Sequence, residues 1–317
     1  MPVRPEYTPA DAVATDRRAA GSMVAAIAFA TLTLILLAVP ASAQTPLAIT
    51  IDDVPWNGVE PLDGAAGGTD RLLATLMERG IQATGFVVCN RMEDGAPIVR
   101  AWLAAGMEIG NHSAAHRDLN SGMQPWLDEA RRCESQLASI TGKRGGFFRF
   151  PYLHQGPTAA IRDEVADALA GMSYRTAHVT IDNSEWILAR AYGRALQAAD
   201  ERTSEEIGSA YVAHMLDAAR HFRRVAREKF GRNVAQVLLV HANALNADWL
   251  GEVLDSLTAE DFTFVSLEVA LRDPVFLLPD AYVGRRGLSW LYRAAPLSQP
   301  DPWDEAAEDA LVRRFGE

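Results

Sequence analysis

The sequence predicts an α/β fold, a distorted seven-stranded (β/α) barrel of the TIM-like type. Seven short apolar segments alternate with helical patterns, which is typical of a parallel sheet whose strands are joined by helices. Some of these segments, such as residues 237–240, are uninterrupted, as in strands that are buried on both faces. Ionisable residues end or follow five of the seven segments, and closing the sheet would bring these distant strand ends around one opening.

Each expected strand is a short run enriched in β-branched, aliphatic or aromatic residues. The strands are expected over residues 47–53, 83–89, 108–112, 147–152, 174–182, 236–242 and 262–267. No convincing eighth strand is present, so the barrel is a seven-stranded variant.

The segments between the strands have apolar residues at helical spacing, as Leu72, Leu73 and Leu76 show. Glycines end several of these patterns. The expected helices cover residues 69–79, 96–105, 123–140, 158–170 and 247–257, and the charged insertion 187–232 is interpreted as two helices. Within this insertion, His214 and His221 are interpreted as surface residues.

Both ends of the chain differ from the predicted barrel domain, residues 44–271. Arginines precede the apolar run 23–39, and Ala41-Ser42-Ala43 has the small residues of a cleavage site, so residues 1–43 are predicted to be a secretory signal peptide. Cleavage would leave an exported protein, periplasmic or secreted, without a stable membrane span; an uncleaved anchor is the alternative. The proline-rich residues 272–317 are expected to form an irregular extension with a last helix over 304–315.

Composition narrows the class of protein. The chain has 317 residues, 49% of them hydrophobic, which is typical of a globular protein with a substantial core. Its formal net charge of −11 argues against a nucleic-acid partner. The two cysteines, Cys89 and Cys133, lack the spacing of a zinc site, and a disulfide or two buried thiols are equally compatible with the sequence. The sequence contains neither a Gly-x-Ser-x-Gly nucleophile elbow nor a phosphate-binding glycine motif.

The polar residues at the strand ends form a possible metal site. Asp53, His112 and His116 supply one carboxylate and two imidazoles, and histidines four residues apart can point at the same ion. Such a set leaves coordination positions open for water and substrate, and it accepts several divalent ions. Asp52 alternates with Asp53 along a regular strand, but a turn at the strand end would aim both side chains into the opening.

Further residues supply acid and base groups. Asp52 is the candidate general base, and Arg149 could keep it ionised and oriented. His241 is the candidate general acid, with Asp182 or Glu185 as the carboxylate that orients it. These residues, together with the metal set, are the groups that a metal-dependent hydrolase requires. His154 is close to Arg149 in sequence and is a candidate for lining the cleft.

Five motifs in order resemble those of the polysaccharide deacetylases of carbohydrate esterase family 4. The motifs lie at Thr50–Asp53, His112–His116, Arg149–Tyr152, Asp182–Trp186 and Leu239–His241. The resemblance implies a distorted (β/α) barrel that hydrolyses the N-acetyl group, or in some members an O-acetyl group, of a glycan. It also implies a divalent metal, commonly zinc, with cobalt, manganese or nickel as alternatives.

The resemblance also implies roles for single residues. Asp52 matches the base, His241 the acid, Arg149 the residue that steadies the base, and Asp53, His112 and His116 the metal ligands. The backbone N–H of Tyr152 matches the oxyanion donor, and Trp186 matches a wall of the acetyl pocket. Two departures stand out: Glu185 precedes the tryptophan where the family most often has Asp, and Leu153 and His154 follow the third motif in place of glycine.

The expected function is therefore that of an exported deacetylase acting on an acetylated amino-sugar polymer or oligosaccharide. A non-catalytic glycan-binding module on the same scaffold is the first alternative, although a degenerate enzyme would be expected to lack a ligand or an acid–base residue. A metal-dependent hydrolase of another non-peptide C–N bond, such as a cyclic amide, is the second.

Overall fold

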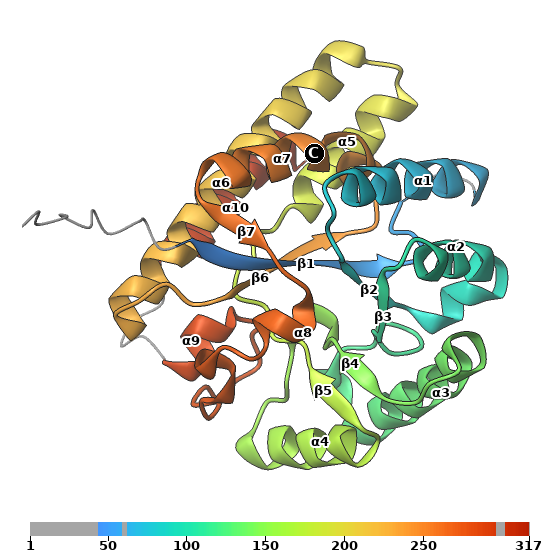
Figure 1. Ribbon diagram of the computed structural model, residues 1–317, viewed down its shortest axis with the longest axis vertical. Helices are drawn as coiled ribbons and strands as arrows, with labels where there is room; N and C mark the ends of the chain where they lie inside the picture. The colour runs from blue at the N-terminus through green and yellow to red at the C-terminus, as the bar shows by residue number, and fades with distance from the viewer. Residues whose placement is uncertain (1–43, 59–61, 296–301, 317) are drawn as a thin grey trace, which may run out of the picture. The chain divides into compact units, whose positions relative to one another are not determined.

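The computed structural model describes residues 44–58, 62–295 and 302–316, so the predicted signal peptide lies outside the described residues. Parallel strands alternate with helices along the chain, and most of the larger helices surround the strands (Figure 1). The strands are β1 (Thr45–Val54), β2 (Thr84–Val87), β3 (Glu108–Asn111), β4 (Gly146–Phe148), β5 (Tyr174–Thr176), β6 (Gln236–His241) and β7 (Phe262–Phe264). All seven predicted strands are thus confirmed, most of them shorter than expected.

The sheet has the order β5-β4-β3-β2-β1-β6, and β7 pairs with the first residues of β1. After β5 the chain leaves β4 and meets β6, where Ile181 forms an isolated parallel bridge with Leu238. The Ile181 N–H donates to the carbonyl of Val237 at 3.0 Å, and the Leu239 N–H donates to the carbonyl of Ile181 at 3.3 Å. The sheet therefore curls into a distorted barrel, as the sequence predicts, and its seam is joined at this isolated bridge.

The main helices cover the sheet and agree with the expected segments. They are α1 (Leu62–Glu78), α2 (Met92–Ala104), α3 (Met123–Thr141), α4 (Ala159–Gly171), α5 (Trp186–Gln197), α6 (Glu201–Phe230) and α7 (Ala244–Ala259). Helix α3 ends where Gly142 adopts a left-handed conformation with φ of 69°, a conformation that glycine allows without strain. Side-chain caps begin others, as Asn243 does by accepting from the Asn246 N–H at the start of α7.

The predicted insertion 187–232 forms two helices, α5 and α6, which pack against each other and against α7. Asp200 starts α6 by accepting a hydrogen bond from the Thr203 N–H, and a buried stripe of α6 includes Tyr211 and Phe222. The expectation that His221 is a surface residue is wrong, because its ring is buried and bonded to the Tyr292 hydroxyl at 2.9 Å. His214 is only partly exposed, and its ring is hydrogen-bonded to the Asn183 carbonyl.

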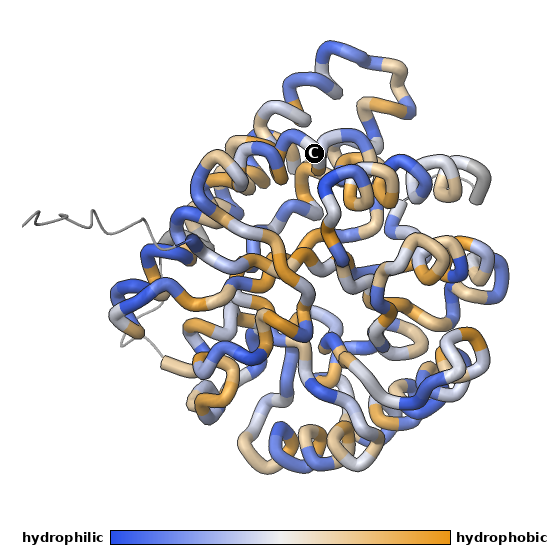
Figure 2. The backbone as a smooth tube through the Cα atoms, viewed as in Figure 1, coloured by the Kyte–Doolittle hydropathy of each residue, from blue (hydrophilic) through white to orange (hydrophobic). Residues whose placement is uncertain are grey.

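The hydrophobic core lies between the strands and the inner faces of the helices. Hydrophobic residues concentrate on the central strands, whereas the outer helices carry most of the hydrophilic positions (Figure 2). Ala48, Ile49 and Thr50 of β1, which alternate between the two faces, are at most 1% exposed, consistent with a strand that is covered on both faces. Among the described residues, none of the helices has the length and apolar character that a membrane crossing requires.

The C-terminal extension packs against the barrel seam. It follows the short helix α8 (Leu267–Ala270). It contains η4 (Pro274–Leu277), α9 (Trp290–Ala294) and the last helix α10 (Pro302–Phe315). The Ser289 hydroxyl donates to the Thr180 carbonyl at 2.7 Å, and the Trp290 N–H donates to the Val179 carbonyl at 2.6 Å. The extension thereby holds the segment that bridges β5 and β6.

Candidate active site

A cavity of about 930 Å³ opens at the carboxyl ends of the strands. Asp52 and Asp53 both line it, although they are neighbours on β1. Asp53 has a left-handed conformation with φ of 65°, and the register between β1 and β2 shifts between Ile51 and Val54. This turn aims both carboxylates into one opening, as the sequence analysis required. A non-glycine residue in this conformation costs on the order of 1–3 kcal/mol, a kind of strain that is common at functional sites.

The predicted metal ligands converge at this cavity. One donor atom each from Asp53, His112 and His116 lie within 4.8 Å of one another. The Asp53 Oδ1 atom is 3.8 Å from His112 Nε2 and 3.6 Å from His116 Nε2, and it is buried without a hydrogen-bond partner among the described residues. An orphaned carboxylate oxygen facing two ring nitrogens is a donor set that fits a divalent metal ion.

The rings of His112 and His116 are in the neutral form that metal binding requires. Burial lowers the pKa of His112 and the pKa of His116 to about 4 each, so both rings are neutral near pH 7. His112 Nδ1 lies 2.8 Å from the Arg149 carbonyl oxygen, which requires the proton on Nδ1. The Nε2 lone pair is left facing both carboxylates, 3.6 Å from Asp52 Oδ2 and 3.8 Å from Asp53 Oδ1. Such a backbone acceptor commonly fixes the ring of a metal-binding histidine.

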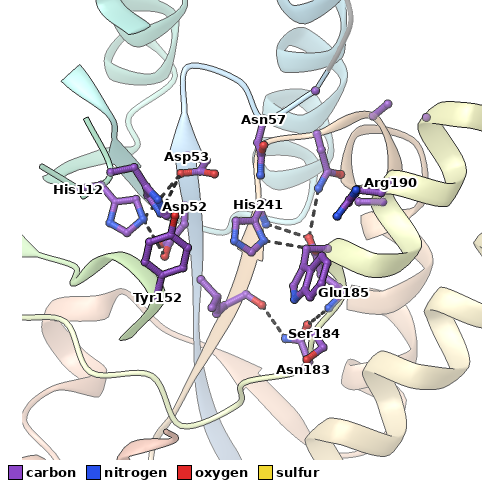
Figure 3. Close-up of a pocket in the computed structure, with 18 of the residues that line it drawn as sticks. Asp52, Asp53, Asn57, His112, Tyr152, Asn183, Ser184, Glu185, Arg190 and His241 are labelled. Atoms are coloured by element: carbon purple, nitrogen blue, oxygen red, sulfur yellow. Dashed lines mark hydrogen bonds and ion pairs between the residues drawn. The ribbon is translucent and has the colours of Figure 1, made fainter. Parts of the chain in front are cut away.

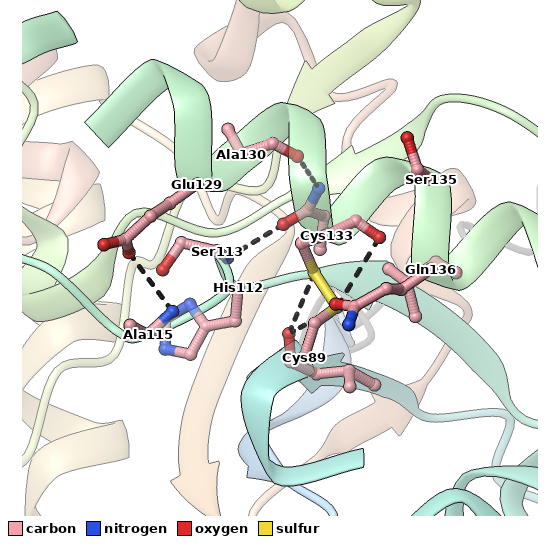
Figure 4. The surroundings of a disulfide bond; sticks show 12 residues. Cys89, His112, Ser113, Ala115, Glu129, Ala130, Cys133, Ser135 and Gln136 are labelled. Atoms are coloured by element: carbon pink, nitrogen blue, oxygen red, sulfur yellow. Dashed lines mark hydrogen bonds between the residues drawn. A yellow bond between two sulfur atoms is a disulfide. The ribbon is translucent and has the colours of Figure 1, made fainter. Parts of the chain in front are cut away.

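A disulfide, Cys89–Cys133, lies beside the segment that leads from His112 toward His116 (Figure 4). The sequence left this pairing open. The Cys89 N–H donates to the Ser113 carbonyl at 3.1 Å, and the Ala115 N–H donates to Glu129 Oε2 at 3.1 Å. Because Cys133 and Glu129 belong to α3, this helix and the segment that follows β2 together fix the turn between the two histidines.

Asp52 is paired with a buried guanidinium. Arg149 Nη1 lies 3.1 Å from Asp52 Oδ1 and 3.3 Å from Oδ2. The rest of the arginine is anchored, because Nε donates to the Ala177 carbonyl at 2.8 Å and Nη2 donates to the Thr50 hydroxyl at 3.0 Å. Burial raises the pKa of Asp52, while the Arg149 charge acts in the opposite direction. The result is an oriented carboxylate with a raised affinity for a proton.

His241 faces the cavity beside Glu185 (Figure 3). Glu185 Oε2 is 3.3 Å from His241 Nδ1, and Oε1 accepts from the His241 N–H at 3.0 Å. Burial opposes charging of the ring, but Glu185, by its charge and hydrogen bond, raises the pKa of His241 to about 9. Asp182 also lines the cavity, and burial raises its pKa to about 6. Of the two carboxylates left open by the sequence, Glu185 is the one that contacts the ring.

Sequence reasoning missed two asparagines that hold Glu185. Asn246 Nδ2 donates to Glu185 Oε1 at 2.6 Å, and Asn243 Nδ2 donates to the same oxygen at 3.3 Å. Both asparagines lie just beyond His241 and begin α7. Their nearness to His241 in the sequence was the available signal, but an amide near a helix start is usually only a cap.

Three residues were proposed to contact substrate. Tyr152 lines the cavity with φ of 57°, and its ring packs edge-on against His116 at 4.6 Å between centroids. Trp186 also lines the cavity and is 40% exposed. His154 is not among the residues that line the cavity, because its Nδ1 is bound to Asp118 Oδ1 at 2.8 Å. The expectation that His154 lines the cleft is therefore wrong.

Comparisons with known proteins agree with the motifs. A family model described as polysaccharide deacetylase matches residues 41–177. The chain is 21% identical over 214 residues to the peptidoglycan-N-acetylmuramic acid deacetylase PdaA of Bacillus subtilis (strain 168), which covers 67% of this chain and 70% of that protein.

Solved structures share the fold. The polysaccharide deacetylase Bc1974 from Bacillus cereus matches with a TM-score of 0.52 and 18% identity, over 70% of this chain and 91% of that one. The wild-type BA3943 protein from Bacillus anthracis, described as a CE4 family pseudoenzyme, matches with a TM-score of 0.52 and 15% identity, over 72% and 66%. At these identities the likeness extends to the fold alone.

Proposed function

We propose that this chain is a member of the polysaccharide deacetylase family, an exported, metal-dependent hydrolase that removes acetyl groups from an amino-sugar polymer or oligosaccharide. The N-acetyl group is the preferred target. The observation that carries the proposal is the convergence on one cavity of an Asp53–His112–His116 donor set, an Asp52–Arg149 pair and a His241–Glu185 pair.

The donor set would hold a divalent ion, for which we propose zinc, with cobalt, manganese or nickel as alternatives. Such an ion supplies Lewis acidity, which activates a water and polarises the acetyl carbonyl. The orphaned Asp53 oxygen and the fixed His112 tautomer support this assignment.

The chain's own residues would move the protons. Asp52, oriented by Arg149, accepts a proton from the attacking water, and the backbone N–H of Tyr152 stabilises the developing oxyanion. His241, protonated near pH 7 because Glu185 raises its pKa, gives its proton to the leaving nitrogen. The C–N bond breaks, and the products are a free amine and acetate. Trp186 forms part of the wall around the acetyl group.

Export is supported by two separate features. The N-terminal pattern is that of a signal peptide, and the Cys89–Cys133 disulfide is typical of an oxidising compartment outside the cytosol. A sugar polymer of the cell wall is a substrate that such a compartment offers. The name of the Bacillus subtilis relative, a peptidoglycan-N-acetylmuramic acid deacetylase, also supports a glycan substrate.

A non-catalytic glycan-binding module is the second candidate, because the BA3943 structure shares this fold and is described as a pseudoenzyme. Acetate release from acetylated oligosaccharides by the purified metal-loaded chain separates the two candidates. Hydrolysis of another non-peptide C–N bond would give turnover of a cyclic amide without acetate release.

Replacing the base tests the mechanism directly. Asp52→Asn keeps the volume of the side chain but removes its ability to accept a proton, so kcat is expected to fall by about 10²–10⁴-fold. The metal content of this variant, measured by elemental analysis, should stay near that of the parent, because Asp52 is outside the donor set. Asp128→Asn, at an exposed position on α3, is the matched control. Activity of Asp52→Asn close to that of the parent would refute the assignment.

A further inference from the structure

Helix α5 forms one wall of the cavity along its whole length. The residues that line the cavity from this helix recur at helical spacing and are Trp186, Ala189, Arg190, Gly193, Arg194 and Gln197. The helix rises about 16 Å from the first to the last of them, at 1.5 Å per residue. Trp186 begins this wall at the proposed acetyl pocket. The lining residues after it lie farther along the helix, so they are available to the remainder of a glycan.

Two cations on this wall have no acidic partner among the residues that the structure describes. Arg190 and Arg194 are four residues apart and therefore lie on one face of the helix, and both are exposed. The Arg190 guanidinium lies 5.9 Å from the centre of the Trp186 ring, and Arg194 Nη2 donates to the Phe315 carbonyl at 2.8 Å. Within the described part of the chain, neither arginine forms an ion pair with a carboxylate.

Arg149 and Arg91, which face the proposed catalytic groups, differ from the two arginines on α5 because each has an acidic partner. Arg149 is paired with Asp52, and Arg91 contacts Asp53 at 3.6 Å. Their charges are thus already balanced within the protein. The arginines on α5 keep their charge available in a chain whose net charge is −11, where an acidic partner would be easy to supply.

The position of Arg190 relates it to the reaction. Arg190 lies on the Glu185 side of His241, whereas Asp53 and His112 lie on the other side (Figure 3). An acetyl group placed at Asp53, with its nitrogen beside His241, therefore directs the rest of the glycan toward α5. A substituent on the same sugar or on its neighbour would meet the two arginines.

We propose that Arg190 and Arg194 form an anion subsite that binds a carboxylate of the glycan, so that the preferred substrate is an acidic acetylated glycan. This inference rests on the proposed function and adds the substrate class to it. Guanidinium groups suit carboxylates because their N–H groups match both oxygens at once. The carboxylate can belong to a neighbouring uronic acid or to an acidic ether substituent on the acetylated sugar itself.

The space between the arginines fits such a ligand. Gly193 lies between them on the wall, and a Cβ atom added there would meet nothing within 4 Å. The helix therefore exposes its backbone at this point and leaves room for a sugar ring. Glu308, the acid that α10 contributes to the cavity, accepts a hydrogen bond from the Ser184 hydroxyl at 3.2 Å and is not paired with either arginine.

Matched substrates test the subsite. Acetate release is measured on an oligosaccharide of alternating N-acetylglucosamine and glucuronic acid, and on the same oligosaccharide with its carboxyl groups reduced to alcohols. The parent is expected to show a KM about tenfold lower on the acidic form, the effect of two charge pairs of up to about 0.7 kcal/mol each. A third substrate, a glycan of N-acetylglucosamine and N-acetylmuramic acid, distinguishes a carboxylate on the acetylated sugar from one on its neighbour.

The variants test the residues. The double variant Arg190→Gln and Arg194→Gln should bring the KM ratio between reduced and acidic substrates close to one, whereas Lys at both positions should keep part of the preference. Salt should weaken the preference of the parent but not alter the ratio in the Gln variant. Arg202→Gln, on α6 outside the cavity, is the matched control and should keep the parental ratio.

Failure of the subsite is distinguishable from failure of the proposed function. Acetate release with equal KM on acidic and reduced substrates, or a preference that persists in the Gln variant, would overturn the subsite and leave the deacetylase intact. Calorimetry can also show that the parent binds the acidic oligosaccharide and that the Gln variant does not. If the parent then released no acetate, the result would support the subsite and refute the deacetylase. Absence of both binding preference and turnover would overturn both.

Discussion

The interaction between Glu185 and His241 offers the most informative single substitution. Glu185→Gln preserves the shape of the side chain but removes the negative charge beside the ring. It also places an amide where Oε1 now accepts hydrogen bonds from the His241 and Asn246 N–H groups. We expect this change to lower both the pKa of His241 and the free energy of unfolding.

The magnitude follows from the pKa of His241. Burial lowers it, but Glu185 raises it from the ordinary 6.5 to about 9, and 2.5 units correspond to about 3 kcal/mol. Because the pKa is higher in the folded state, this stabilisation is fully present below about pH 6.5 and is lost as the pH rises through about 9. The free energy of unfolding of Glu185→Gln should therefore fall short of the parental value by about 3 kcal/mol near pH 6, and the difference should shrink near pH 10.

Two assays follow these expectations. Urea denaturation at several pH values measures the stability difference, and kcat/KM for acetate release measures the pH at which the acid loses its proton. In the pH profile of kcat/KM, activity of the parent should fall on the basic side near pH 9. Activity of Glu185→Gln should fall along this basic limb below about pH 7. Asp182→Asn, which alters the other nearby carboxylate, should move this limb much less. A basic limb that stays in place in Glu185→Gln would refute the assignment of His241 as the acid.

Three further predictions concern stability and metal binding. Replacing Cys89 and Cys133 by Ala removes a cross-link over 44 residues and should lower the free energy of unfolding in urea by about 4 kcal/mol. A chelator should lower the melting temperature of the parent by about 10 °C, and His116→Ala should abolish that shift. Gly208→Ala places a Cβ atom 2.0 Å from the Trp249 ring, so it should destabilise the protein by about 1–3 kcal/mol although alanine favours helices.

Hydrophobic pattern predicted every strand of the barrel but not where the strands end. The run 147–152 reads as one strand, yet β4 ends at Phe148, and the chain turns through left-handed conformations farther on, at Tyr152 and Leu153. The run 174–182 pairs first with β4 and then with β6, so only its first three residues form a ladder with β4. Apolar residues indicate that a segment is buried, and a segment stays buried where its pairing partner changes. The hydrophobic pattern therefore does not mark the end of a strand.

The part of the candidate site that could be predicted from the sequence is the part whose residue types together suggest metal binding. Asp53 and the two histidines form this part, since their grouping follows from strand ends that meet at one opening. The choice between Asp182 and Glu185 was not predictable, because it depends on how the loop after the seam turns. His154 was assigned wrongly because Asp118, distant in sequence, binds its ring.

The distance between Asp52, the proposed base, and His241, the proposed acid, is set by the backbone. Asp52 and His241 face each other as register partners in the β1–β6 ladder, and the Ala242 N–H donates to the Asp52 carbonyl at 3.0 Å. Arg149 and Glu185 then orient the two side chains from opposite sides. Substitution of these partners should consequently change pKa and orientation while the separation of the two strands stays constant. The backbone therefore fixes the spacing of the two groups, and the neighbouring side chains set their pKa values. A site assembled from distant strand ends can in this way be rigid in spacing while its proton affinities remain adjustable by substitution.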